Sequence, residues 1–203
     1  GDVNIVKFFL TSGVDVNEKG KFGVTALINS AQQGHKEVVE LLIAKGADVN
    51  MTGNGVTALN AAARLGHKEV VELLIAKGAD VNLKGNNGWP PIARAVQWGR
   101  GQIIELLIAN GANVNAIITS SRNYKGKSTL DVAIESKKRK LVPILRNHGA
   151  KTSEELKAEG KKINPKQSEP AKEDKKLWAK SYLNKKAPEL IVEKWLSEKP
   201  EWK

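Results

Sequence analysis

Gly34-His-Lys-Glu-Val-Val-Glu-Leu-Leu-Ile-Ala-Lys-Gly-Ala-Asp-Val-Asn50 is the stretch that decides the fold, because it returns unchanged at residues 66–82. A substituted copy occupies residues 99–115, a divergent copy residues 1–17, and a shortened copy residues 137–150. Self-similarity at a period of about 33 residues is typical of repeat architectures. The chain is therefore predicted to be built from one unit used several times.

Each copy is predicted to form a helix. Val38, Leu41 and Leu42 recur at helical spacing and form one apolar stripe. Gly46 is placed to end the helix, since glycine adopts the left-handed conformation without penalty. A second, shorter helix is expected upstream of the copies at residues 25–31, 57–63 and 90–96. Thr25 and Thr57 suit the N-cap positions of the first two.

A single pair of such helices cannot bury its apolar face, whereas stacked pairs share a continuous core. We therefore predict an all-α solenoid of stacked helix–turn–helix pairs with β-hairpin loops. The expected boundaries are a repeat domain at 1–150, with a partial repeat at 1–17, repeats at 18–50, 51–82 and 83–115, and a capping repeat at 116–150. A short helix and linker at 151–176 and a tail at 177–203 complete the chain.

The units resemble the ankyrin repeat. The family's Thr-Pro-Leu-His-x-Ala-Ala helix start appears as Thr25-Ala-Leu-Ile-Asn-Ser-Ala31 and Thr57-Ala-Leu-Asn-Ala-Ala-Ala63. The Gly-His…Val-Val…Leu-Leu…Gly-Ala-Asp-Val-Asn tail is kept nearly whole. Departures include Pro143, which is expected to interrupt and kink the last outer helix. We also expect residues 1–17 to fray unless a preceding repeat covers their apolar face.

The resemblance implies a protein–protein interaction module that binds its partner on a concave face of hairpin tips and first helices. The family's variable contact positions fall here on Phe22, Val24, Gln32, Gln33, Asn54, Val56, Arg64, Leu65, Asn87, Trp89, Gln97, Trp98 and Tyr124. Six of them, Phe22, Val24, Val56, Leu65, Trp89 and Trp98, are expected to form one exposed apolar stripe, which is typical of an interaction site. Alternatively, Trp89 lies on its own hairpin, and Trp98 packs under the following insertion near Ile117 and Ile118.

Catalytic and cofactor chemistry finds no support in the sequence. The chain has no cysteine, which excludes thiolate metal sites and cysteine nucleophiles within it. His35 and His67 follow the inter-helix glycines, and no third group is spaced to complete a metal site, so we expect each to hydrogen-bond a neighbouring repeat. The formal charge of +11 invites a nucleic-acid reading. However, most lysines alternate with glutamates and form no continuous phosphate track.

The residues after Ala150 no longer follow the repeat pattern. Thr152 and Glu155 form a capping-box pattern for a short helix to about residue 159. Residues 160–176 are polar and proline-punctuated, which is typical of a linker. Residues 184–203 resemble the entry to a thioredoxin-like redoxin domain, although Asn184 replaces the usual glycine. Alternatively, this segment is an amphipathic tail that docks on the stack or stays disordered.

Two functions follow from these observations. The first is a binding module that is not an enzyme, with a protein partner, no cofactor, no metal, no membrane contact, no nucleic acid, and a monomeric state. The alternative is the partner-recruiting front part of a thiol–disulfide oxidoreductase whose catalytic domain lies beyond Lys203. The absence of cysteine is compatible with the cytoplasm, and a redoxin fusion leaves a bacterial extracytoplasmic location open.

Overall fold

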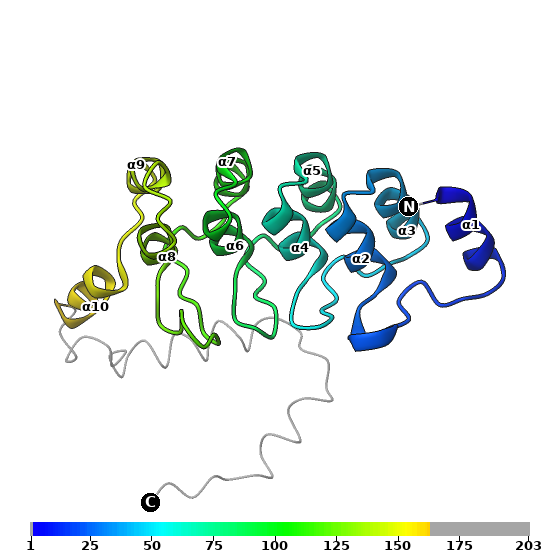
Figure 1. Cartoon of the computed structure of the whole chain (residues 1–203), viewed down its shortest axis with the longest axis horizontal. Coiled ribbons are helices and arrows are strands. Elements are labelled where there is room, and N and C mark those ends of the chain that lie inside the picture. Colours follow the sequence, from blue (N-terminus) through cyan, green and yellow to red (C-terminus); the bar gives the residue numbers. More distant parts are fainter. Residues whose placement is uncertain (1, 163–203) are drawn as a thin grey trace, which may run out of the picture. The chain divides into compact units, whose positions relative to one another are not determined.

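The computed structural model describes residues 2–162 and consists of stacked helix pairs (Figure 1). Residues up to Ala158 form one compact unit. The α-helices are α1 (Val3–Thr11), α2 (Ala26–Gln33), α3 (Lys36–Ala44), α4 (Ala58–Leu65), α5 (Lys68–Ala76), α6 (Pro91–Gln97), α7 (Gly101–Ala109), α8 (Thr129–Glu135), α9 (Leu141–Asn147) and α10 (Ser153–Lys162), and η1 (Lys21–Gly23) is a short 3₁₀ turn. The predicted all-α class is confirmed.

The helices form two rows. The inner helices α2, α4, α6 and α8 contact one another in chain order, and the outer helices α1, α3, α5 and α7 do the same. Each of α3, α5, α7 and α9 also packs on the inner helix that precedes it. The loops between pairs project on the side of the inner helices (Figure 1). In the part of the chain that the structure describes, these loops hold the isolated β-bridges Gly53–Val56 and Ile117–Ser128 rather than extended strands.

The core runs between the two rows. Val38 and Leu42 of the predicted stripe are buried, while Leu41 is half-buried. The structure adds Val39, which is fully buried although it lies beside the predicted stripe. An outer helix faces its own inner helix and also the outer helices on either side, so it buries a wider arc than a helix lying on a single partner.

Helix ends follow the sequence signals. The hydroxyls of Thr25 and Thr57 accept hydrogen bonds from the backbone N–H groups of Ile28 (3.3 Å) and Asn60 (3.1 Å), so both predicted N-caps are confirmed. Gly46 adopts φ of +90° just after α3, as expected for its C-terminal signal.

Asparagines at the ends of the repeat tails tie each repeat to the next. The Asn50 side chain accepts a hydrogen bond from the Asp80 N–H (2.9 Å) and donates one to the Gly78 carbonyl (3.2 Å). Asn17, Asn82 and Asn115 make the same pair of bonds to the following unit. A primary amide offers both a donor and an acceptor, which is why one side chain can clamp two backbone groups.

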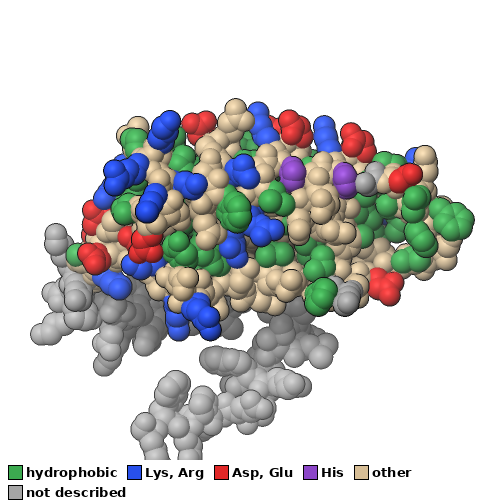
Figure 2. All heavy atoms as spheres, in the orientation of Figure 1, with side chains coloured by type: hydrophobic (Ala, Val, Ile, Leu, Met, Phe, Trp, Pro, Cys, Tyr) green, Lys and Arg blue, Asp and Glu red, His purple; other side chains and the backbone are tan. Residues whose placement is uncertain are grey.

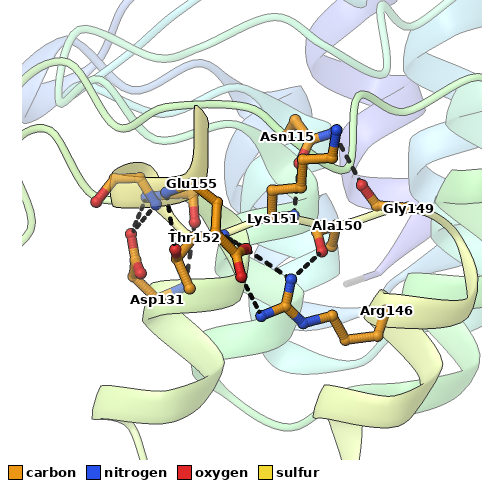
Figure 3. Close-up of polar contacts among 10 residues, drawn as sticks. Asn115, Asp131, Arg146, Gly149, Ala150, Lys151, Thr152 and Glu155 are labelled. Carbon is orange, nitrogen blue, oxygen red and sulfur yellow. Dashed lines mark hydrogen bonds and ion pairs between the residues drawn. The ribbon is translucent and has the colours of Figure 1, made fainter. Parts of the chain in front are cut away.

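Helix α10 closes the stack (Figure 3). The Thr152 N–H donates to the Glu155 carboxylate (2.8 Å), and the Glu155 N–H donates to the Thr152 hydroxyl (3.1 Å), which confirms the capping box. Arg146 of α9 donates two hydrogen bonds to the Glu155 carboxylate, at 2.6 and 2.9 Å. Asp131 of α8 accepts from the Ser153 N–H at 2.9 Å. Side chains of the last repeat thus hold the start of α10.

Two expectations concern the ends of the stack. Pro143 does not break a helix midway, because α9 begins only at Leu141 and the proline lies in its first turn. Backbone N–H groups have no intrahelical partner there, so proline is tolerated and the expected kink is not required. At the other end, α1 buries none of its residues, and Phe8 is 67% exposed. The expected fraying of residues 1–17 stays a prediction.

Candidate functional site

The inner helices and the loops that precede them form one surface, which we call the inner face. Three hollows among the described residues concern the predicted contact positions. The first, of about 580 Å³, lies between α1 and α2 and includes Phe22, Val24 and Gln32 in its lining. The second, of about 230 Å³, is lined by Gln32, Asn54, Val56, Asn60, Ala61, Arg64, Asn87 and Arg94. The third, of about 320 Å³, lies against the insertion at residues 120–124.

The structure brings many of the predicted contact residues together. Gln32, Asn54, Val56, Arg64 and Asn87, from three successive repeats, share the second hollow, which we call the central hollow. Asn87, Gln97, Trp89 and Tyr124 line the third. Gln33, Leu65 and Trp98 line none of these three hollows and lie at the C-terminal ends of their inner helices.

The expectation that Trp89 faces solvent is wrong. Its side chain is 3% exposed and belongs to the core cluster. The Tyr124 ring, carried by the insertion of the next repeat, meets it edge-to-face with ring centroids 5.1 Å apart. The Arg94 guanidinium lies 4.4 Å from the Trp89 ring centroid. Both covering groups come from outside the Trp89 hairpin, so its own surroundings in sequence did not reveal the burial.

The predicted apolar stripe is therefore divided. Phe22 (73% exposed) and Trp98 (48% exposed) present large apolar surfaces to solvent. Val24, Val56 and Leu65 are half-buried. Arg64 and Arg94 line the central hollow together with Val56, and Figure 2 shows Lys and Arg side chains beside hydrophobic ones over α4 and α6. The inner face is thus mixed, with aromatic, amide and guanidinium groups side by side.

Arg94 is the residue that sequence reasoning missed. It lies three residues before Gln97 on α6, and its Nη1 donates to the Gln97 amide oxygen at 3.2 Å. Side chains three apart share a helix face, so this spacing could have added Arg94 to the predicted positions. Burial, with a smaller contribution from the charge of Arg64, lowers the pKa of Arg94 from 12.5 to about 10. The inner face thus holds a partly desolvated cation.

His67 has a structural role, because it links two neighbouring repeats. Nε2 of His67 lies 3.0 Å from the Gln32 carbonyl of the preceding repeat, which confirms the expected hydrogen bond between neighbours. Arg100 occupies the equivalent position one repeat on and donates to the Arg64 carbonyl at 3.2 Å. Across residues 2–162 no cluster of His, Cys, Asp or Glu is arranged to hold a metal ion, and no helix is long and apolar enough to cross a membrane.

Comparison with known proteins agrees with the architecture. A family model described as ankyrin repeats (3 copies) matches residues 1–85 and 52–118. The chain is also similar to ankyrin repeat domain-containing protein 29 of Danio rerio, at 42% identity over 52 residues. That match covers 25% of this chain and 17% of the relative's length. The predicted redoxin resemblance at residues 184–203 lies outside the described residues and outside the segments that the family model matches.

Proposed function

We propose, because this chain belongs to the ankyrin repeat family, that it captures a partner protein on the inner face. Ankyrin repeats suggest a protein–protein interaction module, and the inner face supplies the means. The observation that carries the proposal is the convergence of Gln32, Asn54, Val56, Arg64 and Asn87 from three repeats around one hollow. Residues so far apart in sequence meet there because the stack aligns equivalent positions of neighbouring repeats.

The chemistry of this surface suits protein recognition. Interfaces are enriched in aromatic residues and arginine, with polar groups arranged around them. The exposed rings of Phe22 and Trp98 can anchor apolar side chains of a partner. The amides of Asn54 and Asn87 can pair with a partner's backbone, because each amide donates and accepts. Trp89 contributes by supporting Tyr124 and Arg94 from beneath rather than by direct contact.

The test is a comparison of two triple variants of the full chain in affinity capture. The inner-face variant carries Gln32→Ala, Asn54→Ala and Asn87→Ala. The control carries Glu40→Ala, Glu72→Ala and Glu105→Ala, which are exposed positions on outer helices α3, α5 and α7. We expect the inner-face variant to lose the partners that the wild-type chain retains and the control to keep them. Capture that survives the inner-face changes, or that depends on the outer glutamates, contradicts the proposal.

The second function is recruitment for a thiol–disulfide oxidoreductase. It is supported by the resemblance of residues 184–203 to a redoxin entry segment, and it assigns the repeats the same binding role. A Cys-x-x-Cys motif encoded within the next few dozen residues after Lys203 would support it, because thiol–disulfide exchange requires a thiolate. A stop codon directly after Lys203 would exclude it. The monomeric state is a separate proposal that sedimentation equilibrium tests.

A further inference from the structure

The central hollow combines a small volume with strongly donating walls. At about 230 Å³ it is smaller than the hollows that hold drug-sized ligands. Arg64 and Arg94 line it together with the amides of Gln32, Asn54 and Asn87. Its size suits one side chain of a partner, and its walls offer guanidinium and amide N–H groups to whatever enters.

Positive charge in the central hollow has no matching acid in its lining. No carboxylate is among the described residues that line it. The ion pairs Lys68–Glu72, Lys127–Glu135 and Arg146–Glu155 use neither of these arginines. In the same region, Nε of Arg94 is buried without a hydrogen-bond partner, and so is Oδ1 of Asn60. A buried donor left unpaired costs free energy that an incoming acceptor would recover.

An aromatic ring lies close to Arg94, and another lies at a longer distance from Arg64. Arg94 lies over the Trp89 ring at 4.4 Å from its centroid, and its Nη1 is bonded to Gln97. Arg64 lies 5.9 Å from the centroid of the Trp98 ring. A guanidinium fixed by stacking loses less rotamer freedom when it binds a ligand, and its planar fork matches a carboxylate.

We propose that Arg64 and Arg94 form a receptor for a carboxylate side chain, so that the partner protein inserts an exposed Asp or Glu into the central hollow. This inference rests on the proposed function and names the chemistry of the partner. The single negative charge of the carboxylate would attract both guanidinium groups and so reduce the net positive charge of the central hollow from two to one. Both the burial and the like charge that lower the pKa of Arg94 would then be compensated by an opposite charge.

A nucleic acid fits the hollow less well. Phosphate backbones bind along continuous tracks of cations. Here two arginines share the lining of a small hollow with the apolar groups Val56 and Ala61 and with side-chain amides. A carboxylate at the tip of a protein side chain can enter such a space singly, whereas a polymer backbone must follow the surface.

The experiment measures fluorescence anisotropy at low ionic strength with the full chain. The probes are a labelled alternating glutamate–serine peptide and a glutamine–serine peptide of equal length. We expect the glutamate peptide to bind the wild-type chain more tightly. The double variant Arg64→Gln/Arg94→Gln should weaken that binding by about tenfold or more, as loss of a desolvated charge pair does. Arg94→Lys, which keeps the charge but not the fork, should recover part of the affinity relative to Arg94→Gln.

The matched control is Lys45→Gln/Lys77→Gln, which removes the same charge from exposed positions after α3 and α5. It should change the affinity by less than about twofold, since solvent screens exposed charges. Equal affinity for the two peptides overturns the proposal, as does an equal loss in the lysine control. Stronger binding of labelled oligothymidylate, abolished by the same arginine changes, would assign the hollow to nucleic acid instead.

The experiments distinguish failure of the carboxylate receptor from failure of protein capture on the inner face. If the glutamate peptide shows no preference while the Gln32, Asn54 and Asn87 variant still loses captured partners, the inner face binds protein by other chemistry. If neither effect appears, the inner face is not the binding surface. Circular dichroism of each arginine variant, compared with wild type, verifies that the helices remain folded.

Discussion

Replacing Trp89 by alanine should destabilise the stack far more than replacing Trp98 by alanine. The two tryptophans were predicted from sequence to share one exposed surface, but their exposed fractions are 3% and 48%. They are therefore a matched pair, with the same substitution made nine positions apart at opposite ends of α6. The comparison separates a tryptophan of the core from one of the surface.

The magnitude follows from the contacts that each ring loses. Truncating a buried Trp costs about 3–5 kcal/mol. The edge-to-face pair with Tyr124 and the Arg94 contact place Trp89 within that range rather than below it. Trp98 is only about half buried, so its truncation removes about half of a full burial and one long cation–π contact, which together amount to about 1–2 kcal/mol. For a chain of this size these losses correspond to falls in Tm of about 6–20 °C for Trp89→Ala and about 2–8 °C for Trp98→Ala.

Urea and thermal unfolding followed by circular dichroism of the helical signal will measure both effects. Because repeats couple to their neighbours alone, hydrogen exchange should place the Trp89→Ala loss in α6 and in the insertion at residues 116–128. Equal and small losses for both variants would refute the assignment of Trp89 to the core. A larger loss for Trp98→Ala than for Trp89→Ala would show that Trp98, and not Trp89, is the core residue.

Three further outcomes are expected. Asn50→Ala should lower the free energy of unfolding by about 1–2 kcal/mol in urea titrations, because two hydrogen bonds to the next repeat are lost; no change would mean that the clamp adds nothing. Gly34→Ala should lower the free energy of unfolding more than Gly46→Ala. Both glycines have positive φ, but an added Cβ at Gly34 would lie 2.5 Å from His67 Nδ1, whereas an added Cβ at Gly46 would have no atom within 4 Å. Equal losses would show that the His67 ring moves aside freely. The pKa of Glu155 is lowered from 4.5 to about 2, so its stabilisation of α10 is complete above the unfolded value and is lost as pH falls from about 4.5 towards 2. Exchange of α10 amides should follow this window, and Glu155→Gln should remove the part of the dependence that Glu155 contributes, leaving the part that comes from Asp131, whose pKa is also lowered and which accepts a hydrogen bond from the Ser153 N–H.

Local sequence signals were sufficient for the elements of the stack. Thr25 and Thr57 cap their helices, because a side-chain oxygen there satisfies an N–H group whose partner would lie outside the helix. The capping box of Thr152 and Glu155 formed for the same reason. These interactions span three residues or fewer, so the order of residues along the chain is enough to predict them. The position of His67 against the preceding repeat was predictable too, because the repeat places equivalent residues at a fixed offset.

Tertiary structure decided which side chains reach solvent and which meet one another. Trp89 was misjudged because the Tyr124 that covers it lies 35 positions away, in an insertion whose path the repeat pattern does not specify. Pro143 lies in the first turn of α9 rather than in the middle of a helix, because α9 starts later than the equivalent outer helices. The sequence by itself determined the repeat, the caps and the order of the helix pairs, since short-range spacing and periodicity control them. Only the stacking of the repeats brought Arg64 and Arg94 into one hollow. The partial desolvation of Arg94 could not be predicted either, because it depends on atoms from distant repeats that surround the group in three dimensions.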